Sequence, residues 1–115
     1  MYSKDIKNDL KSNFIEFYDG GKDAIKVKKY NLAVASLFKA IAVLSDYKIY
    51  SEFGSLPKNH NERFRILETK LVPIYEIVVV MFKKYTESYN LRMELEDARK
   101  VLENVEKLKK IINFE

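Results

Sequence analysis

His60 is the one histidine in the chain, and it stands three residues before Arg63. Both fall in the first turn of an expected helix, where unpaired backbone amides and the helix dipole favour an anion. Neighbouring basic residues extend the positive charge, so the sequence predicts an anion-binding site formed by Lys58, His60, Arg63 and Arg65. Because no glycine-rich loop accompanies them, the alternative is structural, with the histidine ring packed on Pro57 in a capping turn.

A second group of basic and aromatic residues lies at 83–92. Aromatic rings stack on nucleobases, and basic side chains contact phosphates. Candidate RNA contacts are therefore Lys83, Lys84, Tyr85, Tyr89 and Arg92. Most other aromatic residues fall on apolar stripes at helical spacing, and we expect core packing for Phe14, Phe17, Phe38, Phe64 and Phe82.

An acidic cluster follows at Glu94, Glu96 and Asp97. Paired carboxylates serve in acid-base catalysis or hold magnesium, but the start of a helix explains acidic residues without either role. With one histidine and no cysteine, the chain lacks the ligands of a zinc site and the thiols of redox chemistry. We therefore expect no catalytic residue, no metal and no cofactor.

The 115 residues are 47% hydrophobic and 33% charged, which predicts one globular domain over residues 1–115. The net charge of +4 is spread along the chain, which favours solvated helix faces and leaves nucleic-acid binding open without indicating it. The most apolar stretch, 71–82, contains Glu76 and is shorter than the roughly 18 residues that span a bilayer. Residues 1–5 lack the apolar run of a signal peptide, so we expect a cytoplasmic protein without membrane contact.

Apolar and small residues at three- and four-residue steps predict a first helix over 3–29. Ser3 is its expected N-cap, and Asp5 falls in its first turn. The apolar phase continues across Gly20 and Gly21, which favours an unbroken helix over a kink at the glycines. Lysines suited to the C-terminal end of the helix dipole stand at Lys26, Lys28 and Lys29.

The same periodicity predicts a second helix over 31–53, which Gly54 ends. Asn59 and Glu62 have the spacing of a capping box, so we expect the third helix to begin at His60. The stripe of the second helix is expected to comprise Leu32, Ala33, Leu37, Ala40, Ile41, Leu44, Lys48 and Ile49.

Pro73 removes a backbone donor and disfavours helical geometry at Val72, which predicts a kink or a short interruption there. The β-branched run 74–82 continues as helix, because no other segment offers it a strand partner. A last helix over 91–113 is expected to be capped by Ser88 or Asn90 and to present an apolar seam of Leu91, Leu95, Ala98, Leu102, Val105, Leu108 and Ile112. Together these segments predict an all-α, antiparallel up-and-down bundle of four to five helices.

Three short motifs occur in order along the first half: AIKVKKYNLA at 24–33, LFKAI at 37–41 and LPKNH at 56–60, with Leu67 after them. In this order they resemble the HEPN helical-bundle superfamily of prokaryotes over about residues 22–68, and the resemblance continues more weakly to Tyr89 and the last helix. It implies an HEPN-like bundle. Many members are dimeric ribonucleases with Arg, four to six residues, then His, and no histidine follows any arginine here at that spacing.

The resemblance therefore implies a non-catalytic binding module, which often acts with a nucleotidyltransferase-type protein in that superfamily. The alternative is an RNA-binding or RNA-processing domain of the same type. A tetratricopeptide-like scaffold is a further alternative, since Tyr30, Ala33 and the 39–41 motif also occur in such repeats. A shift of 34 residues reveals no second copy of that motif, which weighs against a repeat protein.

The segment after Pro73 carries two apolar stripes. One contains Ile74, Ile77, Val78 and Met81, and the other contains Val72, Tyr75, Val79 and Phe82. Because one bundle core covers one stripe, a helix that is apolar nearly all round is either central or in contact with another subunit. We therefore expect a homodimer, with the second stripe as the candidate interface.

Overall fold

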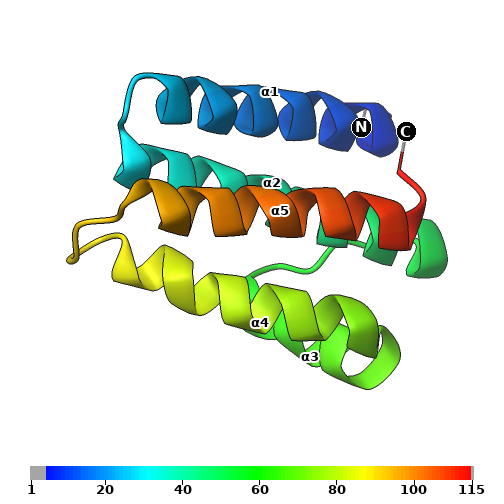
Figure 1. The fold of residues 1–115 in the computed structure, drawn as a ribbon. Coiled ribbons are helices and arrows are strands. Elements are labelled where there is room, and N and C mark those ends of the chain that lie inside the picture. Colours follow the sequence, from blue (N-terminus) through cyan, green and yellow to red (C-terminus); the bar gives the residue numbers. More distant parts are fainter. Residues whose placement is uncertain (1–4, 115) are drawn as a thin grey trace.

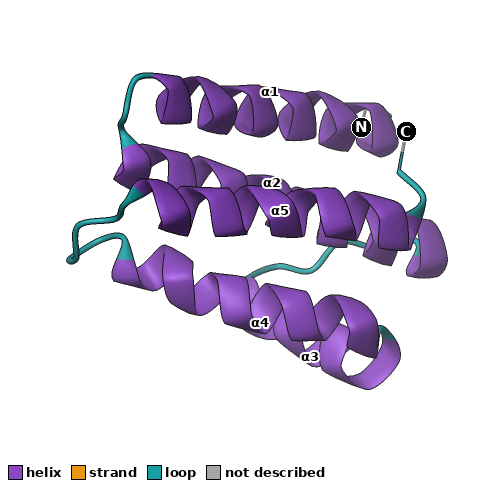
Figure 2. Ribbon diagram, in the orientation of Figure 1, coloured by secondary structure: helices purple, strands orange, loops and turns teal. Residues whose placement is uncertain are grey.

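The computed structural model describes residues 5–114, and this part of the chain forms five helices and no strand (Figures 1 and 2). The helices are α1 (Ile6–Lys26), α2 (Tyr30–Phe53), α3 (His60–Lys70), α4 (Val72–Glu87) and α5 (Leu95–Ile112). In Figure 1, α2 and α5 lie between α1 on one side and the pair α3 and α4 on the other. The expectation of an all-helical bundle is confirmed.

The central helix is α2, which packs against each of the other four. Its small and branched apolar residues are buried on several sides, so it forms most of the middle of the core. The predicted stripe was wrong at Leu32, which lies exposed, and incomplete at Val34 and Phe38, which are buried. A helix enclosed by four neighbours has no single apolar stripe, which is why the periodicity understated its core.

Helix α1 differs from its expected bounds at both ends. It begins at Ile6 because the Asp5 carboxylate accepts a hydrogen bond from the Asn8 amide (3.1 Å), which makes Asp5 the N-cap; the expected cap, Ser3, lies outside the described residues. It ends at Lys26, because Lys28 adopts a left-handed conformation (φ 63°). Only one lysine of the expected cluster therefore lies in the last turn.

The two glycines of α1 do not break it. Gly21 is buried where α1 crosses α2, and a Cβ at this position would lie 2.5 Å from Leu37 Cγ. Gly20 has more room, since its Cβ would meet nothing nearer than Ser36 Oγ at 3.5 Å. The predicted unbroken helix is confirmed, and Gly21 serves the close approach of the two helices.

The predicted ends of α2 and the start of α3 are confirmed. Gly54 takes the left-handed conformation (φ 77°) after α2, and the Asn59 side chain accepts a hydrogen bond from the Glu62 amide (2.9 Å) at the start of α3. The other half of the expected capping box differs, because the Glu62 carboxylate accepts from the Lys58 amide (3.2 Å).

A break separates α3 from α4, as Pro73 predicts, but it lies at Leu71 and not at Val72. The backbone of Leu71 is not helical (φ −138°, ψ 59°). Pro73 lies in the first turn of α4, where the amide hydrogen that proline lacks would have no partner within the helix. The chain reverses at this break, so the start of α3 lies beside the last turns of α4: the rings of Phe64 and Phe82 are 5.0 Å apart.

The last helix begins at Leu95, four residues later than expected. Asp97 reaches back to accept a hydrogen bond from the Glu94 amide (2.8 Å), and this cap sets the start. Neither expected cap acts there, because Ser88 ends α4 and Asn90 lies in the turn that follows. Of the expected seam, Leu91 is exposed, Leu95 and Leu102 are half-buried, and the seam omitted the buried Val101.

Candidate functional site

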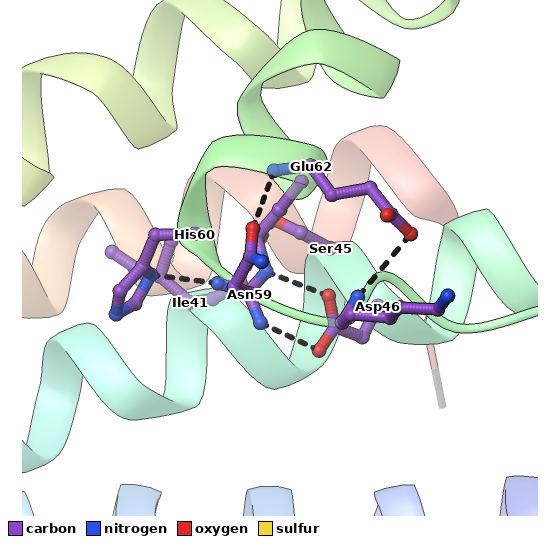
Figure 3. Close-up of polar contacts among 8 residues, drawn as sticks. Ile41, Ser45, Asp46, Asn59, His60 and Glu62 are labelled. Atoms are coloured by element: carbon purple, nitrogen blue, oxygen red, sulfur yellow. Dashed lines mark hydrogen bonds and ion pairs between the residues drawn. The ribbon is translucent and has the colours of Figure 1, made fainter.

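Arg63 and Asp46 form the best-connected polar pair of the molecule, between α3 and α2 (Figure 3). Arg63 Nε donates to Asp46 Oδ1 (2.7 Å) and Nη2 to Oδ2 (2.9 Å), so the guanidinium holds the carboxylate with two parallel bonds. The side chains are only 11% and 16% exposed. The positive charge that the sequence offered to an external anion is thus neutralised within the chain.

His60 is bonded to the same arginine. Arg63 Nη1 lies 2.8 Å from His60 Nδ1, and because a guanidinium only donates, Nδ1 accepts and the ring proton sits on Nε2 (Figure 3). Burial and the Arg63 charge lower the pKa of His60 below its ordinary value of 6.5, while the Asp46 charge opposes them. The imidazole is therefore neutral at pH 7.

The imidazole also belongs to an aromatic cluster. Its ring lies 5.0 Å from that of Phe82 and 6.2 Å from that of Phe38. Tyr85 stacks on Phe38 at 4.7 Å and lies 6.1 Å from Phe82. The cluster joins α2, α3 and α4 around the start of α3.

This cluster depends on the reversal of the chain at Leu71. If the segment from His60 onward were one helix, His60 would lie at the far end from the turn at 88–94, and a second subunit would be needed to bring the two regions together. The reversal at Leu71 instead places His60 beside the last turns of α4 within one chain. Phe82 links the two regions, because its ring lies 5.0 Å from the His60 ring and 6.1 Å from the Tyr85 ring.

The remaining members of the predicted anion site do not join Arg63. Arg65 faces a separate pocket between α2 and α3, and the described contact of Lys58 is its backbone bond to Glu62. The structure therefore brings together His60 and Arg63 alone, and it adds Asp46, which the sequence analysis overlooked. The sequence signal that could have pointed to Asp46 is its position as an acidic residue within the apolar run of α2.

The candidate RNA contacts separate into bonded and exposed residues. Lys84 donates to Asp97 (2.8 Å), which raises the pKa of Lys84 and lowers that of Asp97. The Tyr85 hydroxyl is 2.6 Å from that of Tyr89, and this bond, followed by burial, raises the pKa of Tyr85 to about 12. Exposed side chains remain at Lys83, Tyr89 and Arg92.

The turn between α4 and α5 is held by Asn31, another residue that the sequence analysis missed. Its Nδ2 donates to the carbonyls of Ser88 (2.8 Å) and Leu91 (2.7 Å), and its Oδ1 accepts from the Met93 amide (3.0 Å). No pattern in the sequence marks an asparagine for a partner about sixty positions away.

The outer side of α4 is apolar and only partly covered. Of the expected interface stripe, Val72 and Val79 are exposed, whereas Tyr75 and Phe82 are half-buried against the core. Val80, which lay in neither predicted stripe, is 57% exposed. The stripe is thus divided between the core and the surface.

A groove of about 300 Å³ runs between α4 and α5 beside Val80. Its apolar rim continues to Ile111 of α5, which is 43% exposed. Its charged lining is acidic on α4, at Glu76, and basic on α5, at Lys100 and Lys107.

No group of residues that could hold a metal ion occurs within residues 5–114. In the same range, no helix combines the length and apolarity needed to cross a membrane. Comparison with known proteins gives no match to a protein-family model, to a curated protein or to a solved structure.

Proposed function

We propose that this chain is a non-catalytic, HEPN-like antiparallel bundle that binds other proteins, including a second copy of itself. The observation that carries the proposal is the outer side of α4, where the exposed Val80 lines the groove shared with α5 and Val72 and Val79 are exposed on the same helix. An apolar helix face next to a groove is a feature of interaction surfaces.

The charges around this groove suit a second copy. Glu76 lies on its α4 side, while Lys100 and Lys107 lie on its α5 side. In a two-fold dimer the same patch occurs on both subunits, and with the axis along the groove the acidic α4 side of one copy faces the basic α5 side of the other. A single patch thereby supplies both the apolar contact and the complementary charges.

Sedimentation velocity over a range of concentrations tests the dimer. We expect the wild type to approach twice the 13.6 kDa chain mass, and Val80→Glu to weaken association at least tenfold. Ile15→Glu is the matched control, because Ile15 is as exposed as Val80 but lies on α1. A wild-type monomer at every concentration, or equal loss in both variants, contradicts the proposal.

A nucleotidyltransferase-type partner is the protein partner that the HEPN resemblance implies. Where the neighbouring coding sequence specifies a nucleotidyltransferase-type protein, co-expression of the two chains followed by size-exclusion chromatography tests the pairing. We expect the two to elute together, and separate elution counts against the partnership.

The bonding of His60 supports the absence of catalysis. Its Nδ1 is bonded to Arg63, whose charge is engaged by Asp46, so no free arginine stands beside the imidazole to stabilise developing charge. We expect no cleavage when structured or unstructured RNA is incubated with the protein. Cleavage that His60→Ala and Arg92→Ala both abolish would overturn this part of the proposal.

RNA binding without cleavage is a second candidate, favoured by one observation. Tyr89 is 68% exposed after the last turn of α4, and Lys83 and Arg92 are exposed before and after it in sequence. Fluorescence anisotropy with single-stranded RNA tests it, since phosphate contacts weaken steeply between about 50 and about 200 mM salt. We expect Tyr89→Ala to reduce any such binding and Lys58→Ala to leave it unchanged; equal effects would contradict this surface.

A further inference from the structure

A pocket of about 500 Å³ lies between the C-terminal end of α2 and the outer side of α3. Its volume falls within the range of about 300 to 1,000 Å³ typical of small-molecule sites. It is separate from the groove between α4 and α5 and shares no lining residue with it.

The hydrocarbon part of this pocket comes from three residues. Ile49 is fully buried and Ile66 is half-buried. Phe53, in the last turn of α2, is 49% exposed and presents much of its ring to water. A ligand with an aliphatic chain would remove this apolar surface from water, which is favourable in proportion to the area covered.

The charged part of the lining is entirely basic. Arg65 and Lys70 line the pocket together with Ser55 and Thr69, and no acidic residue does so. The position of Lys70 in the last turn of α3 is favoured by the helix dipole, but Arg65, in mid-helix, has no such explanation.

The two arginines of α3 differ in their partners. Arg63, two residues earlier, is held by both oxygens of Asp46, whereas no ion pair of Arg65 or Lys70 occurs in the described part of the chain. The acids closest in sequence on α2 and α3 do not pair with either cation: Glu52 pairs with Lys48 (2.8 Å), Glu62 accepts from the Lys58 amide, and Glu68, three residues after Arg65, forms no ion pair in the described part of the chain. Two cations beside exposed hydrocarbon therefore lack an anion.

We propose that this pocket binds a soluble amphipathic anion, an aliphatic chain with a single carboxylate head. The chain would lie on Phe53 and Ile66, and the carboxylate would lie between Arg65 and Lys70. The guanidinium offers a planar pair of donors that matches a carboxylate. The proposal is independent of dimerisation and of RNA binding, because it uses a different surface.

Titration with octanoate, followed by isothermal calorimetry and by two-dimensional NMR of the backbone amides, tests the proposal on the full chain. 1-Octanol has the chain without the charge, and acetate has the charge without the chain. We expect saturable binding of octanoate, with shifts confined to the end of α2 and to α3, and at least tenfold weaker binding of either other compound. Absence of saturable octanoate binding, or equal binding of 1-octanol, would overturn the proposal.

Paired variants separate a specific site from general attraction to a basic protein. Arg65→Gln combined with Lys70→Gln removes two charges at the pocket, and Lys28→Gln combined with Lys29→Gln removes two exposed charges between α1 and α2. We expect at least a tenfold loss of octanoate affinity in the first variant and less than a twofold change in the second, with circular dichroism confirming that both are folded. Equal affinity in the two variants would overturn the site, as would binding that survives Phe53→Ser unchanged.

Discussion

The start of α3 and the outer side of α4 differ in whether their side chains have partners within the chain. At the start of α3, Arg63 is bonded to Asp46 and to His60, and the imidazole packs beside aromatic rings. On the outer side of α4, Val79 and Val80 are exposed to solvent. The sequence predicted binding at both places, as an anion site at the helix start and as a dimer interface on the apolar run. The structure pairs the charges of the first within the chain, so they are not offered to a ligand, and it leaves part of the second uncovered and accessible to a partner.

The largest expected effect comes from removing one member of the buried ion pair. Asp46→Ala leaves the Arg63 guanidinium without its carboxylate in a mostly buried position, and we expect a loss of about 3 kcal/mol in the free energy of unfolding. Glu52→Ala, which breaks the more exposed pair with Lys48 on the same helix, should cost no more than about 0.5 kcal/mol. Urea denaturation measures both, and equal losses would show that the α3 pair is no more than a surface contact.

Two positions of α4 that are two residues apart test the contrast between its faces. Val78 is fully buried, so Val78→Ala should cost about 2 kcal/mol through lost burial and the cavity that remains. Val80→Ala, at the exposed position, should change the free energy of unfolding by no more than about 0.5 kcal/mol. Denaturation at low protein concentration is required, so that any dimer is dissociated. A large cost at Val80 in the monomer would show that it packs within the chain.

Asn31 and Asn104 allow a comparison with a smaller expected effect, between a side chain that bonds to a distant segment and one that bonds within its own helix. Asn31→Ala removes three hydrogen bonds to the turn between α4 and α5, and we expect a loss of about 1 to 2 kcal/mol. Asn104 bonds only to the Lys100 carbonyl of its own helix, and Asn104→Ala should be neutral within about 0.5 kcal/mol, since alanine favours helix. Amide hydrogen exchange should show faster opening of residues 88–93 in the first variant alone.

The smallest expected effect is a pH dependence from His60. The pKa of His60 is lowered in the folded chain, so the unfolded chain binds more protons around pH 6. The stabilisation from the neutral imidazole is complete above the unfolded pKa of 6.5 and decreases as the pH falls through it toward the folded pKa. We expect the free energy of unfolding to decrease as the pH falls from 7.5 to 5.5, and we expect this decrease to be smaller in His60→Gln.

NMR titration of the imidazole protons gives an independent check of the same group. The midpoint should lie below 6.5 in the wild type, and Asp46→Asn should lower it further, because the Asp46 charge opposes the shift. A midpoint above 6.5 would contradict the bonding to Arg63 described here.

Much of the fold was predicted from sequence signals that each involve only a few neighbouring residues. Gly54 and Asn59 predicted the end of α2 and the start of α3, and Pro73 predicted the break before α4. These features depend on local backbone geometry and on hydrogen bonds within one turn, which is why a single sequence reveals them. The start of α5 was predicted too early because Leu91 continues the apolar spacing in a turn that Asn31 holds outside the helix.

The candidate site was predicted only in part. The sequence placed His60 and Arg63 in one helical turn, but their partners on α2 and α4 were not predicted. Asp46 is 17 residues from Arg63, and Phe82 is 22 from His60, so neither contact follows from spacing along a helix. The first depends on how α3 folds back onto α2, and the second depends on the reversal of the chain at Leu71.

By itself, the sequence determined the helical class, the glycine that ends α2, the cap that begins α3, and the lack of the histidines and cysteines that a zinc or thiol site needs. Only the tertiary structure decided that Arg63 is neutralised by Asp46 while Arg65 is left beside an apolar pocket. The physical reason is that helix periodicity and capping act over three or four residues. The pairing of charges and the covering of apolar faces depend instead on which helices pack together, and here that follows from the central position of α2 and the break at Leu71.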